Sequence, residues 1–216
     1  SDVCSSDLGK GTQSKLLGKA FGIKHIGMGD LLREEARSGS DVGKKIEPIL
    51  AGGNLVTDEL VNEVIQSQFS KDRGLENFVI EGYPRTLAQA SHLDAALRQK
   101  SLMLNAVVRL EVPDAEIVSR ISGRRMCSGC NATYHTTFMP PKVPDQCDNC
   151  NGLLYQRDDD SEATVLKRLT DYHQITSQLV EHYSKLGILH VLKGVGSVDE
   201  VQNALKALLE QAIRKC

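Results

Sequence analysis

The stretch GKGTQSKLLGKAFGIKHI, residues 9–26, decides the fold class, because it joins a glycine-bounded turn to a helix and then to a strand. Gly11–Ala20 has the pattern of a helix, and Phe21–Ile26 has that of a short strand. A helix N-terminus presents free N–H groups and the positive end of a dipole, and Lys10 adds a charge for phosphate oxygens. GKGT alone is a weak signal for a phosphate-binding site, because a glycine-bounded turn before a helix is common.

The alternation of helices and strands continues along the rest of the chain. Amphipathic periodicity predicts helices at 29–39, 41–53, 57–69, 86–100, 114–125, 161–186 and 197–215, and strands at 77–82, 106–112 and 188–192. Strands that alternate with helices favour a parallel sheet covered by helices on both faces. We therefore predict an α/β fold built on a doubly wound parallel sheet.

The amino-acid composition of the chain limits the kinds of molecule that it is expected to bind. The chain has 216 residues, with 26 Lys and Arg against 28 Asp and Glu, and its formal charge of −2 excludes a generally basic nucleic-acid binder. Aromatic residues make up 4% and Trp is missing, so a stacking surface for single-stranded nucleic acid is not expected. No apolar run approaches the roughly 20 residues of a membrane span, and the first residues do not resemble a secretory signal. We expect a cytoplasmic protein with no nucleic-acid or membrane partner.

Four cysteines form two C-x-x-C pairs with sixteen residues between them. They are Cys127, Cys130, Cys147 and Cys150. Each pair places two thiolates on one tight turn, and two such turns can close a tetrahedral S₄ site. A segment this small buries little core, so we expect a structural Zn²⁺ to hold it together, and no catalytic metal there. Two disulfides or four unpaired thiols are the alternatives. Cys4 and Cys216 are interpreted as ordinary free thiols.

Arginines lie near the predicted ends of strands and helices. Arg85 follows the buried strand at 77–82, at the carboxyl end where α/β proteins bind ligands. Arg120 and Arg124 are four residues apart on one face of a predicted helix, and Arg157 and Arg168 flank an acidic segment. A planar guanidinium suits phosphate through bidentate contact. Any one of them is more often a solvated charge, but together they favour a polyphosphate site.

Seven blocks that span nearly the whole chain from residue 9 onward resemble the adenylate kinase family, in the long form with a zinc-bearing lid. They are GKGTQSKLL, HIGMGDLLR, GGNLVTDELV, EGYPRTLAQA, SGRR, YQRDDDSEATVLKRL and YHQITSQLVEHYSKLGIL. The resemblance implies a P-loop NTPase-like core over 1–122 and 161–216, an AMP-binding helical insertion at 27–56, and a small zinc-ribbon-like β lid at 123–160. It also implies Mg²⁺-dependent transfer of the γ-phosphoryl group of ATP to AMP, which gives two ADP.

The resemblance assigns roles to individual residues. It implies catalytic roles for Lys10, Arg85, Arg124, Arg157 and Arg168. It implies ATP contacts for Gly9, Lys10, Gly11, Thr12, Arg120, Arg124, Tyr134 and Gly196. It implies AMP contacts for Met28, Arg33, Leu55, Val56, Gly82, Arg85, Gln89, Arg157 and Arg168. Asp30 and Glu81 match positions that hold water-coordinated Mg²⁺, and Asp159 and Asp160 match carboxylates of the lid.

The chemistry of phosphoryl transfer independently requires a site of this kind. It needs positioning and charge neutralisation more than covalent help, so many arginines and no obligatory base are expected. Hydrolysis is the competing reaction, and a lid that closes over the site keeps water out. Because the site is complete within one chain and no spare apolar stripe stands out, we expect a monomer.

The chain departs from the family pattern at three places. Met28 stands where the family has Thr or Ser, which places the affinity for AMP or the choice of acceptor in question. Glu81 replaces an Asp, which a water-mediated Mg²⁺ contact tolerates. At the start, Cys4, Ser6 and Asp7 occupy the Gly, Pro and Gly positions of the GxPGxGKGT loop, and the apolar first strand has no counterpart. Asp7 would place a carboxylate beside bound phosphate.

Residues 1–8, SDVCSSDL, are what the string TCAGACGTGTGCTCTTCCGATCT plus one base encodes, which resembles a sequencing-library adapter. Our hypothesis is that this segment replaced a native start, so the chain as written is expected to have reduced activity or none. Two alternatives stay open. One is a non-catalytic nucleotide-binding or zinc-ribbon interaction protein, and the other is a kinase with a different monophosphate acceptor.

Overall fold

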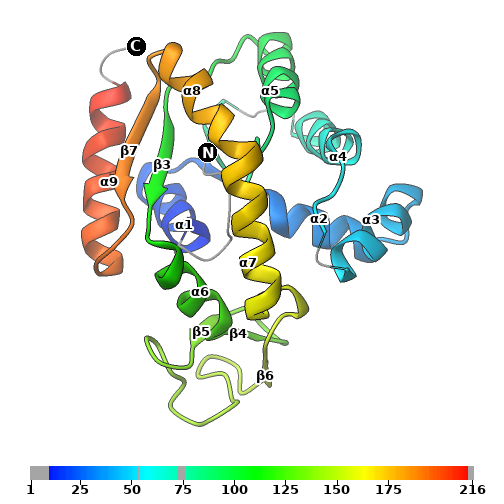
Figure 1. The fold of residues 1–216 in the computed structure, drawn as a ribbon, viewed down its shortest axis with the longest axis vertical. Coiled ribbons are helices and arrows are strands. Elements are labelled where there is room, and N and C mark those ends of the chain that lie inside the picture. The colour runs from blue at the N-terminus through cyan, green and yellow to red at the C-terminus, as the bar shows by residue number, and fades with distance from the viewer. Residues whose placement is uncertain (1–9, 53, 73–75, 214–216) are drawn as a thin grey trace.

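The computed structural model describes residues 10–52, 54–72 and 76–213 of the chain. Its helices are α1 (Lys10–Phe21), α2 (Met28–Arg37), α3 (Asp41–Ala51), α4 (Asp58–Lys71), α5 (Leu87–Gln99), α6 (Asp114–Ser122), α7 (Glu162–Asp171), α8 (Ser177–Lys185) and α9 (Val198–Ile213). Its strands are β1 (Lys24–Gly27), β2 (Phe78–Glu81), β3 (Val107–Glu111), β4 (Arg124–Cys127), β5 (Thr133–His135), β6 (Leu154–Tyr155) and β7 (Leu189–Lys193). Each helix and strand predicted from the sequence pattern is present (Figure 1).

Two predicted helices differ in detail from those observed. The helix predicted at 114–125 ends at Ser122, and Arg124 belongs to β4, so Arg120 and Arg124 do not share a helix face. Gly123 is the C-cap of α6, and Arg124 after it pairs with His135 of β5 in an antiparallel sheet, so the helix ends there. The helix predicted at 161–186 runs through α7 and α8 with a π-helical turn at Tyr172–Thr176 between them (Figure 1).

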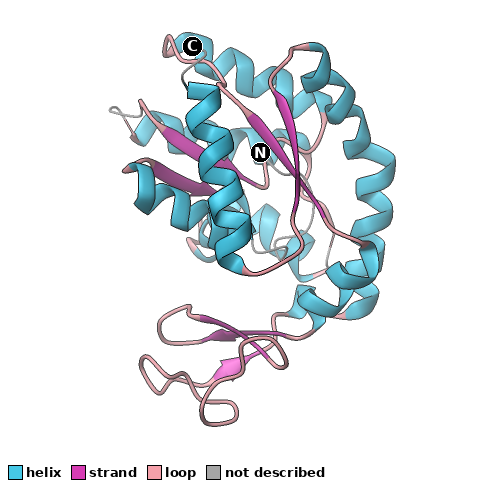
Figure 2. Cartoon of the chain, turned by 90° about the vertical axis from the view of Figure 1, so that its left-hand side faces the viewer, coloured by secondary structure: helices cyan, strands magenta, loops and turns pink. Residues whose placement is uncertain are grey.

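Parallel strands form the centre of the fold, as the sequence predicts. β1 pairs with β2 and β3 pairs with β7, both in parallel, and the described strands of the core form these two separate pairs. Figure 2 shows both pairs surrounded by helices. Within the described part of the chain, no strand joins β2 to β3.

Helices cover both faces of the β3–β7 pair. On one face Val107 packs with Ala90 of α5 and Tyr183 of α8. On the other face Leu110 packs with Leu17 of α1 and Leu205 of α9. Because alternate residues of a strand point to opposite faces, this packing is that of a doubly wound sheet, and the predicted fold class is confirmed.

A second hydrophobic core joins α2, α3, α4 and α5 to β1 and β2. Ile46 of α3, Ile65 of α4 and Leu93 of α5 are fully buried in it. α2 and α3 approach so closely that a β-carbon on Gly43 would lie 2.1 Å from the carbonyl oxygen of Glu35. This core fixes the helices that carry Asp30, Arg33 and Gln89.

Residues 123–160 form a separate antiparallel sheet in the order β5-β4-β6, which lies beyond α6 and α7 at the bottom of Figure 2. Its small core contains Cys127, Cys147, Tyr134 and Leu154. Among the described residues, no helix is both long and apolar enough to cross a bilayer.

Candidate functional site

A cavity of about 850 Å³ lies between α1, α2, the carboxyl end of β2, α6 and the β4–β5 sheet. Arginines from five separate segments of the chain line it. They are Arg33, Arg85, Arg120, Arg124 and Arg157. Gly11, Thr12, Asp30, Glu81, Tyr134 and Gly196 line it as well, so the structure brings together most of the residues that the sequence points to.

Carboxylates hold four of these guanidinium groups, and Arg120, which pairs with Glu116, is described below. Arg33 donates to Asp30 at 2.6 Å. Arg157 donates to both oxygens of Asp159, each at 3.1 Å. These pairs fix the orientation of each planar group while other N–H donors stay available to an anion.

The third pair, between Arg124 and Asp160, is buried. Nε of Arg124 donates to Oδ2 of Asp160 at 2.8 Å, a second bond joins Nη2 to Oδ1, and the Asp160 side chain is 0% exposed. The predicted carboxylates of the lid therefore act on arginines of the cavity.

The arginines also repel one another. Burial lowers the pKa of the Arg33 guanidinium, and the charge of Arg157 lowers it further. Burial and Arg157 lower the pKa of Arg124 in the same way. A group of cations that destabilise each other is stabilised by a bound anion, and phosphate oxygens match the planar geometry of guanidinium.

Arg85 is fixed at the end of β2 by Gly82, by Gln89 of α5 and by the π-helical turn. Its Nε donates to the carbonyl oxygen of Gly82 at 3.1 Å, and its N–H donates to Oε1 of Gln89 at 2.7 Å. Oγ1 of Thr176, at the end of the π-helical turn, donates to the Arg85 carbonyl oxygen at 3.1 Å. The π-helical turn thus places a donor against the backbone that carries this arginine.

Asp58, which the sequence does not single out, completes this arrangement. Its Oδ1 accepts from Nε2 of Gln89 at 2.7 Å, and its Oδ2 accepts from Oγ1 of Thr86 at 2.7 Å. Gln89 is therefore buried with both ends of its amide bonded, one to Asp58 and the other to Arg85. The only sequence signal for Asp58 is its place as an acidic residue in the first turn of α4.

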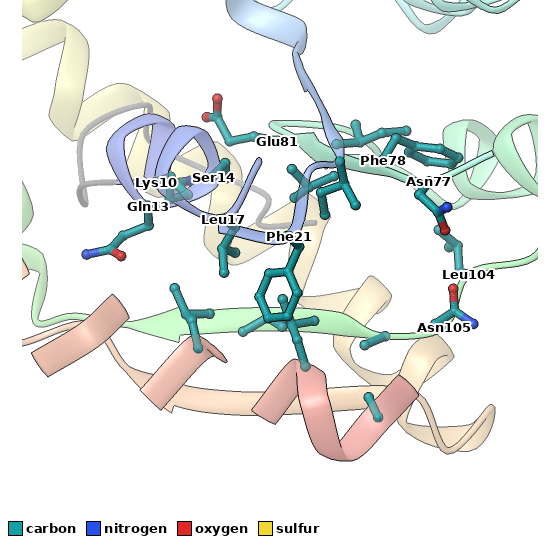
Figure 3. Close-up of a pocket in the computed structure, with 18 of the residues that line it drawn as sticks. Lys10, Gln13, Ser14, Leu17, Phe21, Asn77, Phe78, Glu81, Leu104 and Asn105 are labelled. Atoms are coloured by element: carbon teal, nitrogen blue, oxygen red, sulfur yellow. The ribbon is translucent and has the colours of Figure 1, made fainter. Parts of the chain in front are cut away.

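Several predicted residues lie outside the cavity. Lys10 is 3% exposed and lines a smaller cavity between β2 and β3 (Figure 3). Met28 is 2% exposed and packs in the hydrophobic core. Leu55, Val56, Gly82 and Gln89 are likewise not among the lining residues. Gly9, Cys4 and Cys216 lie outside the described residues, as does the side chain of Arg168.

Two carboxylates approach Gly27 at the edge of the cavity. A β-carbon built on Gly27 would lie 3.4 Å from Oδ2 of Asp30 and 3.5 Å from Oε2 of Glu81. Burial raises the pKa of Asp30, but the hydrogen bond and charge of Arg33 outweigh it and leave that pKa below its usual value. Ionised carboxylate oxygens that face one space suit a hydrated Mg²⁺, and the residues present fit that ion.

The opposite end of the cavity includes residues that sequence reasoning missed. Nε2 of Gln13 in α1 donates to the carbonyl oxygen of Val198 at 2.8 Å. Arg120, which pairs with Glu116, donates to the carbonyl oxygen of Gly194 at 3.2 Å. Both bonds hold the 194–198 loop against the cavity. The rings of His135 and Phe138, 4.4 Å apart, also line this end.

The four cysteines of the β4–β6 segment come together as predicted. Their sulfur atoms all lie within 4.8 Å of one another. All four are free, which rules out the two disulfides, and the close pairs Cys127–Cys150 (3.4 Å) and Cys130–Cys147 (3.5 Å) join the two C-x-x-C turns. The Tyr134 hydroxyl lowers the pKa of the Cys147 thiol to about 6. A tetrahedral site with Zn–S bonds of about 2.3 Å spaces its sulfurs about 3.8 Å apart, so this set fits Zn²⁺.

Comparisons with known proteins agree with the geometry. The family model described as adenylate kinase matches residues 4–188. The chain is similar to adenylate kinase of Methanothrix thermoacetophila, with 40% identity over 203 residues that cover 94% of each chain. It is similar to adenylate kinase of Caldicellulosiruptor bescii, with 43% identity over 201 residues, which are 93% of this chain and 94% of the relative. Adenylate kinase of Archaeoglobus fulgidus is 41% identical over 203 residues, 94% of each chain.

Proposed function

The chain belongs to the adenylate kinase family of nucleoside monophosphate kinases, and on this premise we propose that it transfers the γ-phosphoryl group of ATP to AMP, reversibly and with Mg²⁺, to give two ADP. The observation that carries the proposal is the convergence of Arg33, Arg85, Arg120, Arg124 and Arg157 on one cavity of about 850 Å³. The triphosphate of ATP and the phosphate of AMP, held end to end, need this much positive charge in one place.

The arginines divide the cavity between the two nucleotides. Arg85 and Arg33 would hold the phosphate of AMP at the end of β2, with Gln89 and the backbones of Met28, Leu55, Val56 and Gly82 behind them. Arg120, Tyr134 and Gly196 would bound the site for ATP. Arg124, Arg157 and Arg168 would neutralise the phosphoryl group in transit, with Gly11 and Thr12 at the phosphate end of α1. Lys10, the first residue of α1, would have to turn from the smaller cavity to reach the phosphates.

The reacting atoms need little from the protein beyond this placement. An oxygen of the AMP phosphate attacks the γ-phosphorus of ATP, the bond to the β-γ bridging oxygen breaks, and ADP leaves on the opposite side. Mg²⁺, held through water by Asp30 and Glu81, would neutralise phosphate oxygens. The fixed guanidiniums of Arg124 and Arg157 then face the transferring group at no further cost in reorganisation.

We assign the surrounding segments by their place around the cavity. Residues 27–56 would form the AMP-binding insertion on the core of 1–122 and 161–216, and residues 123–160 would form a lid. Because β4 and β5 contribute Arg124 and Tyr134 to the cavity, movement of this segment changes access of water to the phosphates. Zn²⁺ on Cys127, Cys130, Cys147 and Cys150 would keep the lid rigid without taking part in the chemistry. We expect the monomer to be the active unit.

A panel of acceptors tests the proposal. A repaired chain, in which residues 1–8 are replaced by an aliphatic strand and a GAPGA loop, is incubated with MgATP and AMP, GMP, UMP or CMP, and the diphosphates are resolved by ³¹P NMR. We expect AMP to be the preferred acceptor. Arg157→Ala is expected to lower turnover about 10²–10³-fold. Arg98→Ala, an exposed arginine of α5 outside the cavity, is the matched control and is expected to leave turnover unchanged.

Two results would redirect the assignment. Preference for another monophosphate would make the chain a kinase with a different acceptor. Substitution of Met28 would then be the first test of what sets that choice. Tight binding of nucleotide without turnover, in folded and zinc-loaded protein, would favour a non-catalytic nucleotide-binding protein. The burial of Lys10 away from the cavity is the observation that keeps this second candidate in view.

A further inference from the structure

A cavity of about 420 Å³ opens where β3 leads into α6, and the end of α7 and the π-helical turn form its other side. Figure 1 shows β3 ending above α6, with α7 beside it. The lining of this cavity shares no residue with that of the proposed catalytic cavity. We call it the β3–α7 cavity, and its chemistry follows from the charged and apolar side chains around it.

The strand β3 gives the cavity a cation. Every second residue of a strand points to the same face, so Arg109 and Glu111 lie on the face that begins with Val107. Val107 is buried against Leu179 and Tyr183 of α8. Two residues further along the strand, Arg109 lines the β3–α7 cavity. The cavity therefore has a guanidinium group in one of its walls.

Apolar side chains form another wall. Ile117 of α6 and Leu169 of α7 belong to one buried cluster, and Val112 packs against it. All three line the cavity, together with Pro113 and Val195. Small-molecule sites are typically cavities of about 300–1,000 Å³ with apolar walls and a few polar groups, and this cavity has that size and lining. An apolar group that enters it leaves water, which is favourable.

Both carboxylates at the cavity already have a basic partner. Oε1 of Glu111 lies 3.4 Å from Nη1 of Arg109. Oδ2 of Asp114, in the first turn of α6, lies 3.0 Å from Nε2 of His173 in the π-helical turn. A cationic ligand would have to compete with Arg109 or His173 for these carboxylates, so the cavity does not favour a cation.

The two cations on β3 and β7 have donors without acceptors. A guanidinium has five N–H donors, and within the described residues Arg109 makes the contact with Glu111 but no hydrogen bond. Its Nε is buried and has no acceptor among those residues. Lys193, the cross-strand partner of Glu111, is exposed and has no ion pair in the part of the chain that the structure describes. What the cavity lacks is an anionic acceptor.

We propose that the β3–α7 cavity binds a small organic molecule that carries one carboxylate on an apolar body. The carboxylate accepts from Nε and one Nη of Arg109 as a bidentate pair, and the ammonium group of Lys193 adds a second positive charge. Rotation of the guanidinium towards the carboxylate breaks no hydrogen bond among the described residues, because Arg109 makes none there. The apolar body covers Ile117 and Leu169.

The charges around the cavity limit the ligand to a monoanion. Arg109 and Lys193 are balanced by Glu111 and Asp114, and all four residues line the cavity. Because these charges cancel, a phosphate ester with two negative charges gains no net attraction that offsets the greater loss of its hydration. The β3–α7 cavity thus differs in chemistry from the arginine-rich catalytic cavity, which suits phosphates.

Titration with 4-phenylbutyrate tests the proposal. This probe has one carboxylate and a phenyl ring, and it is added to the ¹⁵N-labelled 216-residue protein without nucleotide. We expect saturable shifts in the ¹H–¹⁵N spectrum, with one probe per chain and a Kd of about 0.1–1 mM. The largest shifts are expected at the amides of Arg109, Leu169 and Lys193. A probe that does not saturate by about 10 mM, or that shifts none of these amides, would overturn the proposal.

Three related probes test the chemistry of the ligand. The neutral amide 4-phenylbutyramide keeps the ring but loses the charge, and acetate keeps the charge but loses the ring. Each is expected to bind at least about tenfold more weakly than 4-phenylbutyrate. 3-Phenylpropyl phosphate, a dianion at pH 8, is expected to bind more weakly as well. Equal or tighter binding of any of the three would contradict a site for an apolar monocarboxylate.

Variants of the protein locate the site. Arg109→Met removes the guanidinium at similar volume and is expected to weaken probe binding about tenfold or more. Lys193→Gln, at an exposed position where folding is not at risk, is expected to weaken it about threefold. Lys185→Gln, an exposed lysine of α8 outside the lining, is the matched control and should have no effect. Unchanged affinity in Lys193→Gln and in folded Arg109→Met would show that the carboxylate binds elsewhere.

The catalytic cavity is the competing location for an anion. Arg157→Ala removes a cation from that cavity and is expected to leave the affinity for 4-phenylbutyrate unchanged. Loss of binding in this variant would place the probe among the catalytic arginines and would also overturn the proposal. None of these measurements uses nucleotide, so their outcome is independent of the proposed kinase activity.

Discussion

Asp160 is completely buried and receives two hydrogen bonds from the guanidinium of Arg124, so a residue that follows β6 fixes a cation that begins β4. This pair joins the two ends of the segment that we propose as a lid. It also keeps the guanidinium of Arg124 at the wall of the cavity. The position of a cation that we propose for the transferring phosphoryl group thus depends on a carboxylate that does not itself line the cavity.

Loss of this carboxylate should affect both stability and turnover. Asp160→Asn leaves Arg124 buried without its counter-charge, and we expect a loss of about 3–5 kcal/mol in the free energy of unfolding. Turnover of the repaired chain, on which the kinetic predictions are measured, is expected to fall about 10–100-fold with AMP and MgATP, since Arg124 is no longer held in place. Urea denaturation and initial rates measure the two effects. Asp41→Asn, in an exposed ion pair with Lys44, should change neither, and an unchanged rate for Asp160→Asn would contradict the role given to Arg124.

Asp58 is a positioning residue for the acceptor site. Asp58→Asn removes one of the two acceptors used by Gln89 and Thr86, and Gln89 in turn accepts from the backbone of Arg85. We expect KM for AMP to rise about 3–10-fold, with kcat and KM for ATP nearly unchanged. Steady-state kinetics measure the split. Glu59→Gln, its exposed neighbour in α4, is the control, and a fall in kcat alone would contradict the assignment.

Gly43 tests the packing of the helices that carry the acceptor site. A β-carbon there would lie 2.1 Å from the backbone carbonyl of Glu35, so Gly43→Ala must move α2 away from α3. We expect a loss of about 1–3 kcal/mol in the free energy of unfolding. Gly39→Ala, at a glycine of positive φ with open space around it, controls for backbone strain. Denaturant titration measures the free energy of unfolding of each variant. Equal stability of Gly43→Ala and the parent would mean that α2 and α3 are not packed this closely.

Zinc removal should act on residues 123–160 alone. The proteins are expected to contain about one Zn²⁺ per chain, and Cys150→Ser is expected to lose it. Chelation should remove the hydrogen-exchange protection of β4, β5 and β6, because a segment this small depends on its metal, while the α/β core stays protected. Cys216→Ser, at a cysteine that belongs to neither C-x-x-C pair, is the control. Retained metal in Cys150→Ser would contradict a four-cysteine site.

The comparison of sequence with structure shows which features local pattern can predict. Periodicity predicted the helices and strands of the α/β core, and the rule that ligands bind beyond the carboxyl ends of parallel strands pointed to Arg85, which lines the cavity at the end of β2. Spacing alone predicted the cysteine cluster. These features depend on residues that are close in sequence, so a local reading is sufficient.

Features that depend on tertiary contact were not predictable. The bond between Asp58 and Gln89 joins residues 31 positions apart on different helices, and that between Gln13 and Val198 joins residues 185 positions apart. Arg124 was placed on a helix, although Gly123 before it is a typical C-cap residue, because helical periodicity does not show that Arg124 pairs with His135 of β5. The burial of Lys10 between the two strand pairs likewise follows from the arrangement of the core.

The most direct test of the account compares two chains in one assay. ADP formation from AMP and MgATP is measured for the chain as written and for a variant in which residues 1–8 are replaced by an aliphatic strand and a GAPGA loop. We predict turnover by the repaired chain, sensitivity of that turnover to Arg157→Ala, and little or none by the chain as written. If both chains are folded and carry zinc, yet neither phosphorylates any nucleoside monophosphate, the cavity is not a kinase site and the central claim is wrong.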